Sequence, residues 1–187
     1  ISLVNNKVVY QVEDEVPVSG QFNPEVLFLD KLSLEGDDIY LKDQSTRGHL
    51  TRLRFHEASG INVDRFELDW VIDDQNLQIS EIDIEALGSE ISGELSAKYT
   101  SLQAMIDQPE HVVVNLNLPH IQVAIEKLYH LQPDLATNPY LQTLAEKPIG
   151  GYISANGPVR ALNVIKAWIE WGTGTSVSAT GQLYNAT

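Results

Sequence analysis

The sequence contains no cysteine and few basic residues: 12 Lys and Arg stand against 26 Asp and Glu, a formal net charge of −14. The absence of thiols excludes thiol catalysis, iron–sulfur clusters and zinc sites built on cysteine. The shortage of Lys and Arg argues against nucleic-acid binding, which needs basic side chains on phosphates. It also argues against a basic patch that holds anionic lipid headgroups.

Long apolar runs are missing as well. No stretch approaches the roughly 20 apolar residues of a membrane-spanning helix. The hydrophobic fraction of 43% is nevertheless that of a folded domain. The chain begins at Ile1 without a recognisable leader and ends in strand-like sequence from Leu183 to Thr187. We therefore expect residues 1–187 to be a single fragment of a longer repeat protein.

Alternation of apolar and polar residues is the dominant pattern, and it predicts half-buried β-strands with one apolar side. The cleanest run contains Phe66, Leu68, Trp70 and Ile72. Turn-forming residues separate the runs. The expected turns are Gly36-Asp37-Asp38, Ser59-Gly60, Asp73-Asp74-Gln75-Asn76, Asn156-Gly157-Pro158 and Gly172-Thr173-Gly174.

Two segments have helical patterns. Apolar residues recur at helical spacing from His120 to Leu131, between Pro119 and Pro133. A shorter helix is expected from Pro139 to Glu146, with Asn138 as its N-cap. The predicted organisation is therefore β units at about 1–118 and 148–187, with a helical insertion at about 119–147.

A degenerate repeat underlies the alternation. Leu27–Glu35, Leu77–Glu85 and Leu162–Glu170 each place apolar residues at steps of two, three and two. A strand keeps one side apolar across a step of three only by inserting a bulge or corner. Gly93 and Gly181 lie in similar tails after the second and third copies. Chance recurrence of short alternating motifs is the alternative explanation.

Such a repeat predicts an elongated, bent antiparallel sheet, because each unit needs neighbours to bury its apolar side. The end strands would expose unpaired edges, which makes self-association possible. Trp70 continues an apolar run, whereas Trp168 and Trp171 lie three apart and point to opposite sides of one strand.

Catalytic and metal-binding motifs are absent from the sequence. The five histidines show neither H-x-x-x-H nor H-E-x-x-H spacing, and we expect them to be solvated or capping residues. Asp37-Asp38 and Asp73-Asp74 lack the calcium-loop pattern and are expected in turns. There is no P-loop and no G-x-S-x-G elbow. We predict a non-enzyme without a cofactor or metal; a hydrolase with two distant carboxylates is the alternative.

Four groups of residues, taken in order, resemble an internal section of a TamB-type translocation and assembly module protein of the AsmA-like superfamily. The resemblance covers Leu27 to Thr187. The groups are Leu50–Ile72 with Glu57-Ala-Ser-Gly60, Val63 and Phe66; Ile82-Asp-Ile84 with Gly88-Ser89-Glu-Ile91, Leu95, Tyr99 and Ser101-Leu102; Leu131-Gln-Pro-Asp-Leu135 with Asn138-Pro139, Leu141, Gly157 and Leu162; and Gly172-Thr-Gly174-Thr with Val177, Gly181 and Leu183.

The resemblance implies a periplasmic segment of an envelope protein whose parent is anchored in the inner membrane of a Gram-negative bacterium. It implies an open, taco-like β groove with an apolar lining, and no catalytic residues. The implied role is transport of phospholipid between the two membranes. The alternatives are assembly of outer-membrane β-barrel proteins by strand templating, with a barrel assembly partner, and a structural spacer. The resemblance is to an internal section, so we do not expect residues 1–187 to include the family's anchor or its conserved C-terminal domain.

Candidate contacts for phospholipid acyl chains follow from the apolar runs and the repeat. They are Leu32, Leu34, Ile39, Leu41, Phe66, Leu68, Trp70, Ile82, Ile84, Leu95, Trp168 and Ile169.

Overall fold

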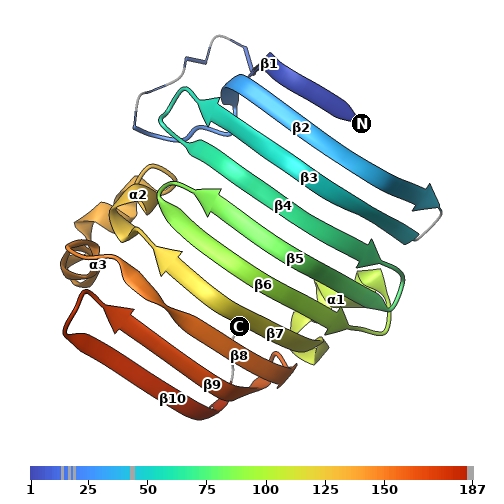
Figure 1. Ribbon diagram of the computed structural model, residues 1–187, viewed down its shortest axis with the longest axis vertical. Helices are drawn as coiled ribbons and strands as arrows, with labels where there is room; N and C mark the ends of the chain where they lie inside the picture. The colour runs from blue at the N-terminus through green and yellow to red at the C-terminus, as the bar shows by residue number, and fades with distance from the viewer. Residues whose placement is uncertain (14, 17, 19, 43–44, 185–187) are drawn as a thin grey trace.

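The fold is one open sheet of ten strands, each hydrogen-bonded to its neighbour in the sequence (Figure 1). The computed structural model describes residues 1–13, 15–16, 18, 20–42 and 45–184. Every strand pair is antiparallel, and the prediction of a mainly β chain with an open, bent antiparallel sheet is confirmed. The strands are β1 (Ser2–Gln11), β2 (Val26–Lys42), β3 (Ser45–Glu57), β4 (Asn62–Ile72), β5 (Asn76–Ala86), β6 (Ser89–Lys98), β7 (Val113–Val123), β8 (Ile149–Pro158), β9 (Ala161–Trp171) and β10 (Thr175–Tyr184).

Short helices lie at the ends of the strands (Figure 1). Helix α1 follows β6, and the helical segment with α2 and α3 lies near the opposite strand ends, between β7 and β8. The elements are α1 (Leu102–Asp107), η1 (Pro109–His111), α2 (Ile125–Leu128), η2 (Pro133–Thr137) and α3 (Pro139–Ala145).

Bulges bend the strands where the repeat predicts them. The pairing register shifts between Asp30 and Ser33 in β2, and between Ile79 and Ile82 in β5. In β9 one residue is skipped between Val164 and Lys166 in the pairing with β8. Each shift falls on the step of three in one copy of the repeat. Because a bulge adds one residue on one strand, the apolar side is preserved and the strand bends.

Two of the expected turns are wrong. Gly36-Asp37-Asp38 lies inside β2, where Asp38 has a φ of +47° and the register with β3 shifts again. A bulge uses the same turn-prone residues as a hairpin, so composition alone did not distinguish them. Asn156-Gly157-Pro158 ends β8, and the turn follows at residues 159–160.

The helix expected from His120 to Leu131 is wrong in its first part. Strand β7 continues through Pro119 to Val123, and α2 covers only Ile125–Leu128. A register shift between Leu118 and Ile121 explains how the strand tolerates proline, because proline is accepted at bulges. The helical insertion is therefore shorter than predicted.

The two longer α-helices, α1 and α3, begin at side-chain caps. The Asn138 side chain accepts hydrogen bonds from the backbone N–H groups of Tyr140 and Leu141, with Pro139 in the first turn, as the sequence predicts. Helix α1 was not predicted. Its N-cap Ser101 accepts a hydrogen bond from the Ala104 N–H at 3.1 Å.

The sheet has little buried core. The protein exposes 11672 Å², roughly 30% more than the about 8,900 Å² expected for a compact monomer of 20.8 kDa. A core cluster of buried residues, formed by Ala97, Tyr99 and Val112, lies under α1, whose Leu102 and Met105 pack against it. Among the described elements, the extensive contacts are those between neighbouring strands. The sheet is therefore a single layer over most of its area.

Candidate functional site

The register of the sheet aligns apolar side chains from strand to strand, since directly paired residues in an antiparallel sheet lie on the same side. Two unbroken rows run from β4 to β10. One row is Phe66, Ile84, Ile91, Ile121, Gly151, Ile169 and Val177; the other is Trp70, Ile79, Leu95, Leu116, Ala155, Val164 and Gly181. We call the side of the sheet that carries these rows the apolar face, and the opposite side the polar face.

The apolar face extends to the first strands. Leu34 pairs with Leu53 across β2 and β3, and Leu50 pairs with Leu68 across β3 and β4. Trp70 is the largest side chain of the rows, and its ring lies across Gly48, where an added Cβ would come within 2.4 Å of it. The Trp70 indole N–H donates to Thr46 Oγ1 at 3.1 Å. The small residue on β3 thus makes room for the ring on β4.

Most side chains of the two rows are only partly buried. Ala155 and Val164 are buried, but Ile169 is 49% exposed and Val177 63% exposed. The helices border this face at the strand ends rather than covering its middle (Figure 1). At one end α1 covers Ala97, and at the other the Trp171 indole N–H donates to the Leu144 carbonyl at 3.0 Å. Apart from the buried Ala155 and Val164, the rows are a partly exposed apolar surface, and no second layer of the described chain packs over its middle.

Trp168 is the predicted contact that does not lie on the apolar face. It pairs with Tyr152 and alternates with Ile169, so it belongs to the polar face. There its ring stacks on Tyr152 with centroids 6.0 Å apart, and Lys166 lies over Tyr152. The prediction that Trp168 and Trp171 point to opposite sides is confirmed, and Trp168 is removed from the set of candidate contacts.

The other predicted contacts share the apolar face. Ile39 and Leu41 are at its margin, because Leu41 is 75% exposed and pairs with Thr46 at the end of β3. Seven non-glycine members of the rows were not among the predicted contacts, because only the register between strands joins them to the predicted residues. They are Ile79, Ile91, Leu116, Ile121, Ala155, Val164 and Val177. The predicted residues on this face are Leu32, Leu34, Ile39, Leu41, Phe66, Leu68, Trp70, Ile82, Ile84, Leu95 and Ile169.

The polar face carries charged side chains. Arg65 lies between two carboxylates, 2.9 Å from Asp83 and 3.5 Å from Glu85. On the same face, His49 forms a hydrogen bond with Asp69, and this bond raises the pKa of His49 above its ordinary value. The charges of Asp37 and Glu81 act in the same direction. These charged side chains thus lie on the face of the sheet opposite the two apolar rows.

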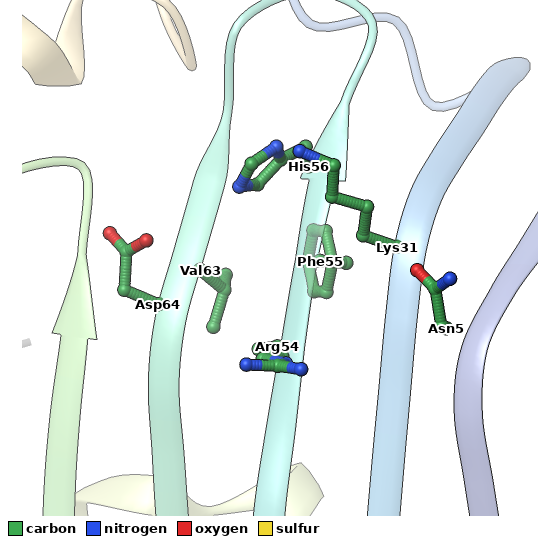
Figure 2. A pocket seen from close by; sticks show the side chains of 7 residues that line it. All are labelled: Asn5, Lys31, Arg54, Phe55, His56, Val63 and Asp64. Carbon is green, nitrogen blue, oxygen red and sulfur yellow. The ribbon is translucent and has the colours of Figure 1, made fainter.

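A hollow of about 220 Å³ opens among β1 to β4 (Figure 2). Arg54 and His56 reach it from β3, Lys31 comes from the β2 bulge, and Asp64 comes from β4. Asn5, Phe55 and Val63 complete its lining. The mixture of both charge signs in a small, open space gives it no clear selectivity for a ligand. None of its lining residues belongs to the two apolar rows, which remain the main candidate site.

The chain matches no family model, and comparisons with curated proteins and with solved structures find no match either. Within the described residues, no helix has both the length and the apolar character needed to cross a membrane.

Proposed function

We propose that this chain is a segment of a periplasm-spanning envelope protein that carries phospholipid between membranes along its apolar face. The observation that supports this proposal is the pair of apolar rows, continuous from β4 to β10 and partly exposed. Large exposed apolar patches on a folded chain mark sites of interaction. The resemblance of the sequence to TamB-type proteins points to the same function.

The dimensions of the rows suit an acyl chain. Six inter-strand intervals of about 4.8 Å give each row a length of about 29 Å. Two acyl chains end to end make the roughly 30 Å hydrocarbon core of a bilayer, so one chain fits along a row. The rows run across the strands. A lipid lying along a row would therefore move from strand to strand, and further strands added at the edge of the sheet would lengthen its path.

The expected affinity suits transport. Burial of one methylene group contributes about 0.8 kcal/mol, so a 16-carbon chain with half of its surface covered gains roughly 6 kcal/mol before the costs of association. This is weak to moderate binding, from which a lipid can leave. The negative net charge does not oppose it, because the apolar face holds acyl tails while zwitterionic headgroups remain in water.

The direct test uses a photo-crosslinking amino acid at Leu95 or at Ser96, in the whole chain mixed with phospholipid. These neighbours lie on opposite faces of β6, since Leu95 belongs to an apolar row and Ser96 pairs with Asn115 on the polar face. We expect lipid adducts at position 95 at least tenfold above those at position 96. Equal labelling at the two positions, or none at either, would overturn the proposal.

A second candidate function is supported by the sheet edges. All of β10 is exposed, including Val177, Leu183 and Tyr184, and its outer side has no partner strand in the described structure. An open edge can pair with an incoming strand through main-chain hydrogen bonds. The incoming strand could come from an outer-membrane barrel protein or from a second copy of this chain.

Edge pairing predicts a specific effect of Val177→Lys. Charged side chains on an edge strand oppose strand addition. If the edge associates, light scattering should show oligomers of the unchanged chain at high concentration, and the variant should shift them toward monomer. Lys166→Ala on interior strand β9 is the control and should leave association unchanged. A chain that is monomeric at all concentrations, and that binds no barrel-derived peptide, would exclude this function and leave a structural spacer as the alternative to lipid transport.

A further inference from the structure

Three side chains that are far apart in the sequence meet on the polar face. His49 on β3 is directly opposite Asp69 on β4, and Asp69 is opposite Ser80 on β5. The residue after Ser80, Glu81, is the extra residue of the β5 bulge and has a φ of +51°. Each of His49, Asp69 and Glu81 offers one ligand atom, and these atoms lie within 4.8 Å of one another. The bulge thus places a second carboxylate beside the His–Asp pair.

This set of atoms matches the preferences of a divalent transition-metal ion. Zinc binds imidazole nitrogen and carboxylate oxygen at about 2.0–2.2 Å, so two of its ligands lie at most about 4.4 Å apart. Small side-chain rotations would bring the three atoms into this range. The side chains are partly exposed or exposed, so water can complete the coordination. A harder ion such as Ca²⁺ would need six to eight oxygen ligands, which this site does not supply.

The surrounding charge favours a cation. Asp37 is opposite His49 on the neighbouring strand β2, so a third carboxylate lies beside the group on the polar face. Among the described ion pairs, neither Asp69 nor Glu81 is paired with a lysine or arginine. The three carboxylates of Asp37, Asp69 and Glu81 therefore outnumber the single imidazole of His49, and the group carries net negative charge.

The position of the group in the sheet gives the ion a structural consequence. The pairing of β3 with β4 is interrupted between Leu50–Leu68 and Phe55–Val63, and His49 and Asp69 are next to the end of the paired stretch. An ion bound to both residues and to Glu81 would join three strands at the point where the ladder opens. We propose that His49, Asp69 and Glu81 form a zinc-binding site that clamps β3, β4 and β5. This site is independent of lipid binding, because it lies on the opposite face.

The test is calorimetric titration of the whole metal-free chain with ZnCl₂, with CaCl₂ and MgCl₂ in parallel. We expect one saturable Zn²⁺ site in the micromolar range, no comparable Ca²⁺ or Mg²⁺ binding, and a rise in melting temperature with Zn²⁺ alone. His49→Ala and Glu81→Gln should each weaken Zn²⁺ binding at least tenfold. Glu81→Gln tests the site separately, since Glu81 is exposed and its replacement is not expected to affect folding.

The matched control is His120→Ala. His120 also lies on this sheet beside a carboxylate, 3.4 Å from Glu90, but without a second acid in a three-residue cluster. This variant should bind Zn²⁺ as the unchanged chain does. Absence of saturable binding would overturn the proposal. So would equal losses in His120→Ala and Glu81→Gln, which would indicate scattered surface histidines rather than one built site.

Discussion

Replacement of Gly93 by alanine is expected to destabilise the sheet severely, by about 4 kcal/mol. Gly93 has a φ of +146°, which L side chains rarely adopt. A Cβ at this position would lie 2.2 Å from the Asn117 carbonyl oxygen and 2.9 Å from Leu118 Cα on β7. Both contacts are with backbone, which cannot rotate away, so strands β6 and β7 would have to separate.

Gly181 separates the two causes of this effect. It follows the third repeat copy as Gly93 follows the second, and its φ of +139° is nearly the same. No atom lies within 4 Å of a Cβ placed there, because β10 is the edge strand. Gly181→Ala should therefore carry only the conformational cost, about 1–2 kcal/mol.

Urea denaturation followed by far-UV circular dichroism measures both variants. The expected order of unfolding midpoints is unchanged chain, then Gly181→Ala, then Gly93→Ala. Gly174→Ala should stay close to the unchanged chain, because Gly174 has neither a left-handed φ nor an atom within 4 Å of an added Cβ. Equal losses at positions 93 and 181 would mean that the collision with β7 does not occur. A stable Gly93→Ala variant would contradict the close approach of Gly93 to the backbone of β7.

The sequence predicted those features of the fold that follow from local periodicity. Where apolar residues that alternate every second position skip to the third, a strand can keep them on one side only by forming a bulge. The structure has such a bulge in all three repeat copies. The helix expected at 120–131 was wrong only in its first part, because α2 covers Ile125–Leu128 and the residues up to Val123 belong to β7. Ile121 near the end of β7 stands three and four residues before Ala124 and Ile125, so one apolar residue of the strand fits the stripe of the helix that follows. Helix α1 was missed because six residues carry too short a pattern.

The apolar face could be predicted in part, and the proposed metal site could not. Alternation assigns each apolar residue to a side, and it places the neighbours Trp168 and Ile169 on opposite sides of β9, so both could not be contacts on one face. The contacts between residues of different strands depend on which strands are neighbours and on their register. His49, Asp69 and Glu81 come from three strands, and only the register places them together. No motif spacing encodes such a site, since its ligands are separated by whole strands.

The second large effect is expected for lipid binding when a charge is placed in an apolar row. Leu116 lies in the middle of one row, between Leu95 on β6 and Ala155 on β8. Leu116→Asp removes apolar contact and places a carboxylate where an acyl chain would lie. We expect this variant to lose about 2–3 kcal/mol of lipid binding, roughly 30- to 150-fold in affinity. Titration of the whole chain with a fluorescent fatty acid measures this loss.

Asn115→Asp introduces the same charge one residue away. Asn115 is exposed on the polar face, opposite Ser96 and Asn156, so its replacement leaves both apolar rows intact. Its lipid affinity should stay within about twofold of the unchanged chain, because water screens a charge on the far side of the sheet. Equal weakening in the two variants would mean that net charge rather than the apolar face controls binding. If Leu116→Asp stays folded by circular dichroism and binds lipid unchanged, the rows do not contact acyl chains. Only a loss confined to Leu116→Asp agrees with a lipid path along one face of an open sheet.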